Sequence, residues 1–211
     1  MLGYSRSLCT SSTIIKEIDR KRKAGLASMA YFYFDFQDTQ KQDLRGLCSS
    51  LIIQLSAESE PYSQILFRLF SDHSDGLQLP SNDALSRCLV EMLTVPGQPA
   101  IYIIIDALDE CPNTSGIPTA REEVLDFLRD LVQLKLSNVH ICASSRPEFD
   151  IRYVLEPLTS FRISLHDESG QNKDISSYID AVVHADREMR RWREEDKLLV
   201  IEALSENADG M

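Results

Sequence analysis

An acidic cluster directly follows the most apolar segment of the sequence. Ala100–Ile105 is an unbroken apolar run, Asp106 follows it, and Asp109 and Glu110 lie three and four residues further on. A carboxylate at the end of a buried strand can hold Mg²⁺ beside nucleotide phosphates, and the two later carboxylates are close enough to orient or deprotonate an attacking water. The same pattern also fits a buried strand followed by a solvated acidic turn. Taken alone, it leaves both interpretations open.

A second apolar run ends in an arginine. Val139–Ser144 is followed by Ser145, Arg146 and Pro147. A guanidinium at the mouth of a sheet can bind a terminal phosphate, whereas the alternative is an ordinary strand-end arginine restrained by the following proline. Because the acidic run stands only some 40 residues earlier, the two runs together favour the functional interpretation.

The elements that must position these residues alternate between strands and helices. Apolar runs predict strands over Met29–Phe36, Ala100–Ile105, Val139–Ser144 and Phe161–Leu165. Helical spacing of apolar residues predicts helices over Ser11–Lys23, Asp43–Ala57, Tyr62–Ser71, Asn82–Leu93 and Arg121–Lys135, and helical structure within Asp174–Ala208. This alternation predicts an α/β fold with a parallel sheet covered on both faces, whose ligands bind beyond the carboxyl ends of the strands.

Composition narrows the class of protein. The chain has 211 residues and a formal net charge of -11, which fits one α/β domain with a small helical appendage and argues against a nucleic-acid partner. A basic cluster near the start is interpreted as the solvated end of a helix; it comprises Arg6, Lys16, Arg20, Lys21, Arg22 and Lys23.

Cysteine and hydropathy patterns point to the cytoplasm. The five cysteines are scattered without a CxxC pair, and no His/Cys spacing resembles a metal site. The first residues lack a signal-peptide apolar stretch, and no window approaches the ~18 apolar residues of a membrane span. We therefore expect a soluble cytoplasmic protein with no membrane partner.

Both functional segments resemble those of one family. YIIIDALDEC and SSRPEFDI resemble the Walker B and sensor segments of NACHT-type domains, especially the nephrocystin-3-like N-terminal domain found in fungal NOD-like receptors, which belong to the STAND class of P-loop NTPases. AYFYFDFQDTQKQD and LRGLCSSLIIQLS resemble the second strand and next helix of that family. The closing SENADGM resembles the end of a helix that precedes the family's usual continuation. The resemblance thus runs over nearly the whole chain.

The resemblance implies a nucleotide-binding signalling switch that oligomerises and binds Mg²⁺ with ATP or GTP. It implies a nucleotide-binding core over residues 1–166 and the start of a helical extension over 167–211. The implied roles are as follows: Asp106 for the metal, Asp109 and Glu110 for hydrolysis, Arg146 as the sensor arginine, and Ser144 and Ser145 as the polar positions beside it.

One part of the family pattern is missing. The sequence contains no G-x-x-x-x-G-K-[ST] segment, and Tyr4–Leu8 stands where that phosphate-binding loop is expected. The strand before the loop is missing as well, and the resemblance implies that it would lie between Val139–Ser144 and Phe161–Leu165. We therefore expect an incomplete core in which Met1–Leu8 partly fills the gap or Phe161–Leu165 is displaced or poorly paired. A truncated gene product and a true loss of function both explain the missing loop.

Three functions stay open from these residues. The chain is a fragment of an NTPase switch, inactive by itself unless a phosphate-binding loop is supplied upstream. Alternatively it is a non-catalytic scaffold that uses the same fold for protein partners or self-association. A third alternative is an accessory piece whose site is completed by another chain.

Overall fold

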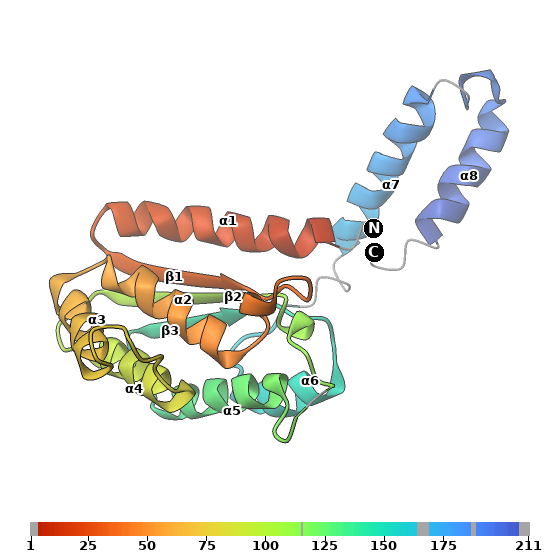
Figure 1. Ribbon diagram of the computed structural model, residues 1–211. Helices are drawn as coiled ribbons and strands as arrows, with labels where there is room; N and C mark the ends of the chain where they lie inside the picture. The colour runs from red at the N-terminus through yellow and green to blue at the C-terminus, as the bar shows by residue number, and fades with distance from the viewer. Residues whose placement is uncertain (1–3, 115, 164–168, 187–188, 207–211) are drawn as a thin grey trace. The chain divides into compact units, whose positions relative to one another are not determined.

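The computed structural model describes residues 4–114, 116–163, 169–186 and 189–206. The chain forms two compact units, Tyr4–Thr159 and a second made of the described residues from Ser160 on. Figure 1 labels the elements of both.

The first unit is built on a sheet of three parallel strands, in the order β1 (Ala27–Tyr33), β2 (Ala100–Asp106) and β3 (Val139–Ala143). Phe32 of β1 lies opposite Ile105 of β2, which lies opposite Ala143 of β3. The three carboxyl ends therefore meet at one edge of the sheet. The predicted α/β fold with strands alternating with helices is confirmed.

The main core lies between one face of the sheet and a layer of helices, α2 (Leu44–Ser56), α3 (Glu60–Asp72), α4 (Asn82–Leu93) and α5 (Ala120–Gln133) (Figure 1). Three of these helices begin at a capping side chain that accepts a backbone N–H of the first turn: Asp43 for α2, Ser81 for α4 and Thr119 for α5. The caps explain why these three helices begin within a residue of their predicted starts.

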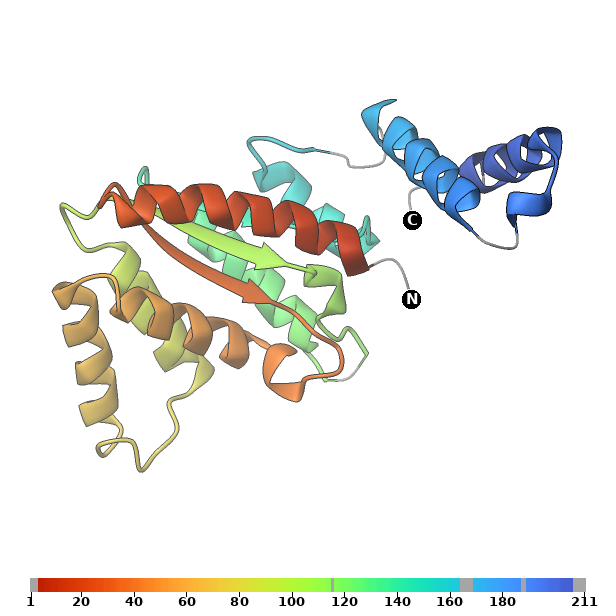
Figure 2. The same cartoon turned by 90° about the horizontal axis from the view of Figure 1, so that it is seen from above.

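Helix α1 (Tyr4–Lys23) covers the opposite face of the sheet (Figure 2). Ile18 is buried against Met29 and Ile104, with Ile14, Ile15 and Tyr102 packed around them. The helix begins earlier than the predicted start at Ser11. Tyr4–Leu8 are therefore helical and do not fill a strand position, while Met1–Gly3 lie outside the described residues.

The basic end of α1 is largely neutralised by ion pairs. Arg20 pairs with Glu17 at 2.8 Å, and Lys23 pairs with Asp19 at 2.6 Å. Arg22 also pairs with Asp19, at 2.8 Å. Arg20, Arg22 and Lys23 thus lie at a helix end, as interpreted, whereas Arg6 of the same cluster lies in the first turn of α1.

Strand β3 is the outer strand on its side of the described sheet. Ile101 N donates to Asn138 O at 2.8 Å and Ser144 N donates to Ile105 O at 2.9 Å. The backbone N–H and C=O groups of successive strand residues point alternately to the two sides of the strand. Those of Ile141 and Ala143 therefore point away from β2. Within the described residues β3 pairs only with β2, so this side of β3, named the open edge of β3 below, has no strand partner in the described part of the chain.

The segment after β3 departs from the prediction. Helix α6 (Phe149–Leu155) and a short 3₁₀ turn (Glu156–Leu158) follow it, and Phe161–Ile163 form no strand. Ser164 and Leu165 lie outside the described residues. A short apolar run becomes a strand only when a neighbour satisfies its backbone, and Phe161 is 81% exposed. The predicted strand at Phe161–Leu165 is therefore wrong over its described part, where the segment joins no strand of the sheet, as the alternative of a displaced segment expects.

The second unit is a helical pair. Helices α7 (Ser169–Ala185) and α8 (Glu194–Glu206) pack against each other, joined through a 3₁₀ turn at Met189–Arg191. His184 Nε2 lies 3.2 Å from the Glu194 carboxylate, and Val183 is buried. No helix in the described part of the chain is both long and apolar enough to cross a membrane.

Candidate functional site

The ends of β2 and β3 are joined through Asp106 and Ser144. Asp106, the last residue of β2, is 1% exposed. Its Oδ1 accepts the Ala107 N–H at 3.1 Å and the hydroxyl of Ser144, and Ser144 Oγ in turn accepts the same N–H at 3.2 Å. The predicted metal carboxylate and the predicted polar residue of the next strand are thus in direct contact.

A tight turn carries the chain from Asp106 to the other two carboxylates. Ala107 has a left-handed φ of 54°, and Leu108–Glu110 form a 3₁₀ turn. Leu108 N donates to Ser144 O at 3.0 Å, which ties the turn to the end of β3. A non-glycine residue in this backbone region costs about 1–3 kcal/mol, so the surrounding contacts must hold the turn in place.

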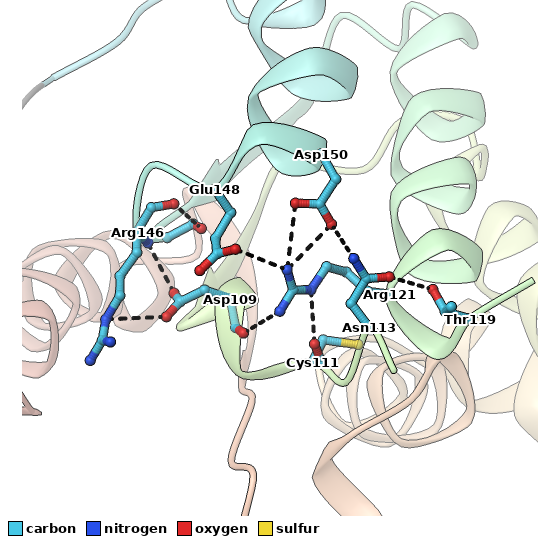
Figure 3. A network of polar contacts seen from close by, with 9 residues as sticks. Asp109, Cys111, Asn113, Thr119, Arg121, Arg146, Glu148 and Asp150 are labelled. Carbon is cyan, nitrogen blue, oxygen red and sulfur yellow. Dashed lines mark hydrogen bonds and ion pairs between the residues drawn. The ribbon is translucent and has the colours of Figure 1, made fainter. Parts of the chain in front are cut away.

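Asp109 and Arg146 form the second contact across the sheet edge (Figure 3). Asp109 Oδ1 accepts the backbone N–H of Arg146 at 3.0 Å, and its Oδ2 lies 3.5 Å from Arg146 Nε. The Asp109 side chain is 12% exposed and that of Arg146 is 72% exposed. The carboxylate is therefore held inside the turn, while the guanidinium faces solvent.

Glu110 turns toward the end of β1. Its Oε2 accepts the backbone N–H of Phe36 at 3.3 Å. Burial raises the pKa of Glu110, the Phe36 N–H opposes this shift, and the nearby charges of Asp109 and Asp35 raise it further. A carboxyl group with a raised pKa is better suited to exchange protons near neutral pH than an ordinary one.

Ser145 differs from the other predicted site residues. It is exposed, and its Oγ donates to the carbonyl of Arg146 at 2.7 Å. Asp106, Asp109, Ser144 and Arg146 thus lie in one network, Glu110 lies at its β1 side, and the hydroxyl of Ser145 bonds to its own neighbour.

The sequence interpretation missed Arg121, which contacts the turn Ala107–Cys111, named the acidic turn below. It is 7% exposed, and its guanidinium donates to the backbone carbonyls of Asp109 and Cys111 (Figure 3). A signal was present, because Arg121 follows Ala120 in the first turn of α5, where the helix dipole favours acidic residues. An arginine there indicates that another interaction holds it.

The residues fit a magnesium site that is shared with phosphate oxygens and water, and not a site made of protein ligands alone. Within the described ranges no group of three or more His, Cys, Asp or Glu side chains is placed to hold a metal ion. Mg²⁺ in nucleotide sites keeps several waters and uses one or two carboxylates together with phosphate oxygens. Asp106 beside the Ser144 hydroxyl fits that arrangement, whereas an all-protein cage does not fit.

A surface hollow elsewhere in the first unit does not involve these residues. It has a volume of about 490 Å³ and lies between α3 and the end of α4, lined by residues such as Ile65, Arg68, Glu91 and Pro96. The candidate site, at the carboxyl ends of the strands, is therefore separate from this hollow.

The structure defines an α/β domain with a parallel sheet, an acidic end on the central strand and an arginine after the neighbouring strand. Residues 6–146 match the family described as Nephrocystin 3, N-terminal, and the chain belongs to this family, which is related to the P-loop NTPases. The matched region ends at Arg146 and so includes every predicted site residue. No curated protein and no solved structure matches the chain.

Proposed function

We propose that this chain carries the magnesium and sensor side of a nucleotide-binding switch, with Mg²⁺ and ATP or GTP as its ligands. The observation that carries the proposal is the pairing of Asp106 with Ser144 and of Asp109 with Arg146 at one edge of the sheet. Parallel α/β sheets bind their ligands at this edge. Membership of the nephrocystin-3 N-terminal family supports the same assignment.

Each residue has a definite task under this proposal. Asp106 holds the metal with Ser144 beside it, and Mg²⁺, when bound with nucleotide, neutralises phosphate charge. Asp109 and Glu110 orient a water and accept its proton, and the raised pKa of Glu110 suits that task. Arg146, whose side chain is largely exposed, is free to reorient toward a terminal phosphate.

This chain by itself should bind nucleotide weakly. Its sequence contains no glycine-rich loop ending in Gly-Lys-Ser/Thr, and that loop supplies most of the direct phosphate contacts in related sites. We expect a dissociation constant no tighter than about 1 mM, or about -4 kcal/mol. Phosphoryl transfer depends on the same positioning, so we expect no turnover from this chain alone.

A second candidate is a non-catalytic scaffold for protein partners or self-association. The open edge of β3 favours it, because Val139–Ala143 contains no charged residue, and natural edge strands usually carry charges that prevent pairing. A strand from another chain could pair there. A nucleic-acid partner is disfavoured by the net charge of -11 and by the ion pairs at the end of α1.

A titration with ATP and Mn²⁺, which replaces Mg²⁺ and broadens nearby amide signals in NMR spectra, separates the two candidates. The switch proposal expects selective broadening at Asp106, Asp109 and Arg146 at millimolar concentrations, lost in Asp106→Asn and retained in the control Asp126→Asn on α5. An absence of selective broadening would favour the scaffold. Micromolar affinity would contradict the view that the phosphate-binding loop is indispensable.

A further inference from the structure

The structure assigns Arg121 as the positioning residue of the acidic turn. We propose that it acts on Asp109 through the backbone, without touching a ligand, and so sets where Asp109 and Arg146 meet. This inference rests on the proposed function for its biological meaning, but its geometry and its test do not require bound nucleotide.

All three guanidinium nitrogens of Arg121 are engaged. Nη2 donates to Asp109 O at 2.6 Å and Nε donates to Cys111 O at 2.8 Å. Nη1 lies 3.3 Å from Asp150 Oδ2 and 3.6 Å from Glu148 Oε2. A buried guanidinium is tolerated only with such complete pairing.

These contacts join three segments that are distant in the sequence (Figure 3). The two carbonyls belong to the acidic turn, the two carboxylates belong to the start of α6, and Arg121 itself opens α5. The backbone N–H of Arg121 also donates to Pro112 O at 3.1 Å. Asn113 completes the connection, since its Nδ2 donates to Asp150 Oδ2 at 3.0 Å and its Oδ1 accepts the Thr119 hydroxyl at 2.8 Å.

These contacts of Arg121 with the acidic turn and with the start of α6, named the clamp below, determine the direction of the Asp109 carboxylate. Arg121 donates a hydrogen bond to the backbone carbonyl of Asp109, and the carboxylate of the same residue accepts the Arg146 N–H at 3.0 Å. Asp109 is thus fixed between two arginines, one buried and one exposed. If the carbonyl were released, the turn, which already contains the left-handed Ala107, would be free to relax and the contact with Arg146 would loosen.

Only an arginine satisfies this geometry. Its planar fork reaches two carbonyls and a carboxylate at once, whereas a lysine ammonium keeps the charge but lacks the fork. Arg121→Lys should therefore preserve the ion pairs with α6 and lose one or both carbonyl contacts. The variant separates positioning from simple charge.

Amide hydrogen exchange measured by NMR without nucleotide tests the proposal. In Arg121→Lys the Arg146 amide should exchange roughly tenfold faster or more, the size expected for losing a hydrogen bond to a charged group, while amides of β2 such as Ile103 stay unchanged. The matched control is Arg129→Lys on the same helix, whose exposed ion pair with Asp126 at 2.8 Å lies outside the clamp. In an Asp109→Asn background the Arg121→Lys change should add nothing.

Equal protection of Arg146 in the variant and the wild type would overturn the proposal, as would a loss that affects the β2 amides equally. If Arg121→Lys does not fold, Asp150→Asn weakens the clamp from the α6 side, and an unchanged Arg146 amide in that variant would also overturn it. The ATP and Mn²⁺ titration tests the proposed function separately, so failure of one is distinguishable from failure of the other.

Discussion

Removing the Ser144 hydroxyl should lower the free energy of unfolding, because the buried Asp106 then loses a hydrogen-bond donor. Asp106 is 1% exposed, and Ser144→Ala takes away one hydrogen bond to its carboxylate and one acceptor of the Ala107 N–H. A hydrogen bond to a charged group contributes about 1.5–3 kcal/mol. For a chain of this size, that loss corresponds to a fall in Tm of roughly 3–12 °C.

Urea and thermal unfolding of Ser144→Ala measure this loss directly. The adjacent Ser145→Ala is the matched control, because Ser145 is exposed and its hydroxyl donates only to the carbonyl of Arg146 in the described contacts. The free energy of unfolding of this control variant should differ from that of the wild type by less than about 0.5 kcal/mol. A double-mutant cycle with Asp106→Asn should give a coupling energy of about 1 kcal/mol or more. Equal effects of the two serine variants, or no coupling, would refute the argument.

The remaining predictions concern the helical pair and the sheet edge. The Asp180 carbonyl and the Glu194 carboxylate raise the pKa of His184 above its ordinary value. The contribution of His184 to α7–α8 pairing is therefore fully present below its pKa in the unfolded chain, about 6.5. It is lost as the pH rises through its pKa in the folded chain. The His184 ring proton signal should therefore titrate above pH ~6.5, and Glu194→Gln should lower the midpoint; an unshifted midpoint would contradict the contact. At the open edge of β3, Cys142→Lys should reduce concentration-dependent association in sedimentation velocity under reducing conditions, relative to Cys142→Ser, because a charge on an edge strand opposes pairing. The edge is not the associating surface if both variants sediment alike.

The sequence by itself determined the elements whose apolar pattern and caps agree. The helix over Asn82–Leu93 begins and ends where its apolar spacing predicts, and in the structure the Ser81 side chain caps it. The β2 strand was predicted for a similar reason, since a continuous apolar run followed by Asp106 is stable only as a buried strand with a polar end. The location of Asp106 and Arg146 at one edge followed from the rule for parallel sheets.

Only the tertiary structure decided how that edge is connected. The contact of Ser144 with Asp106 and that of Asp109 with Arg146 depend on the register of β2 against β3, which no local pattern specifies. The loss of the expected strand at Phe161–Ile163 has the same origin, because a strand exists only where a neighbour receives its hydrogen bonds. The buried position of Arg121 likewise depends on three segments that converge only in the folded chain. Local preference shapes each element, but non-local hydrogen bonds determine which charges meet.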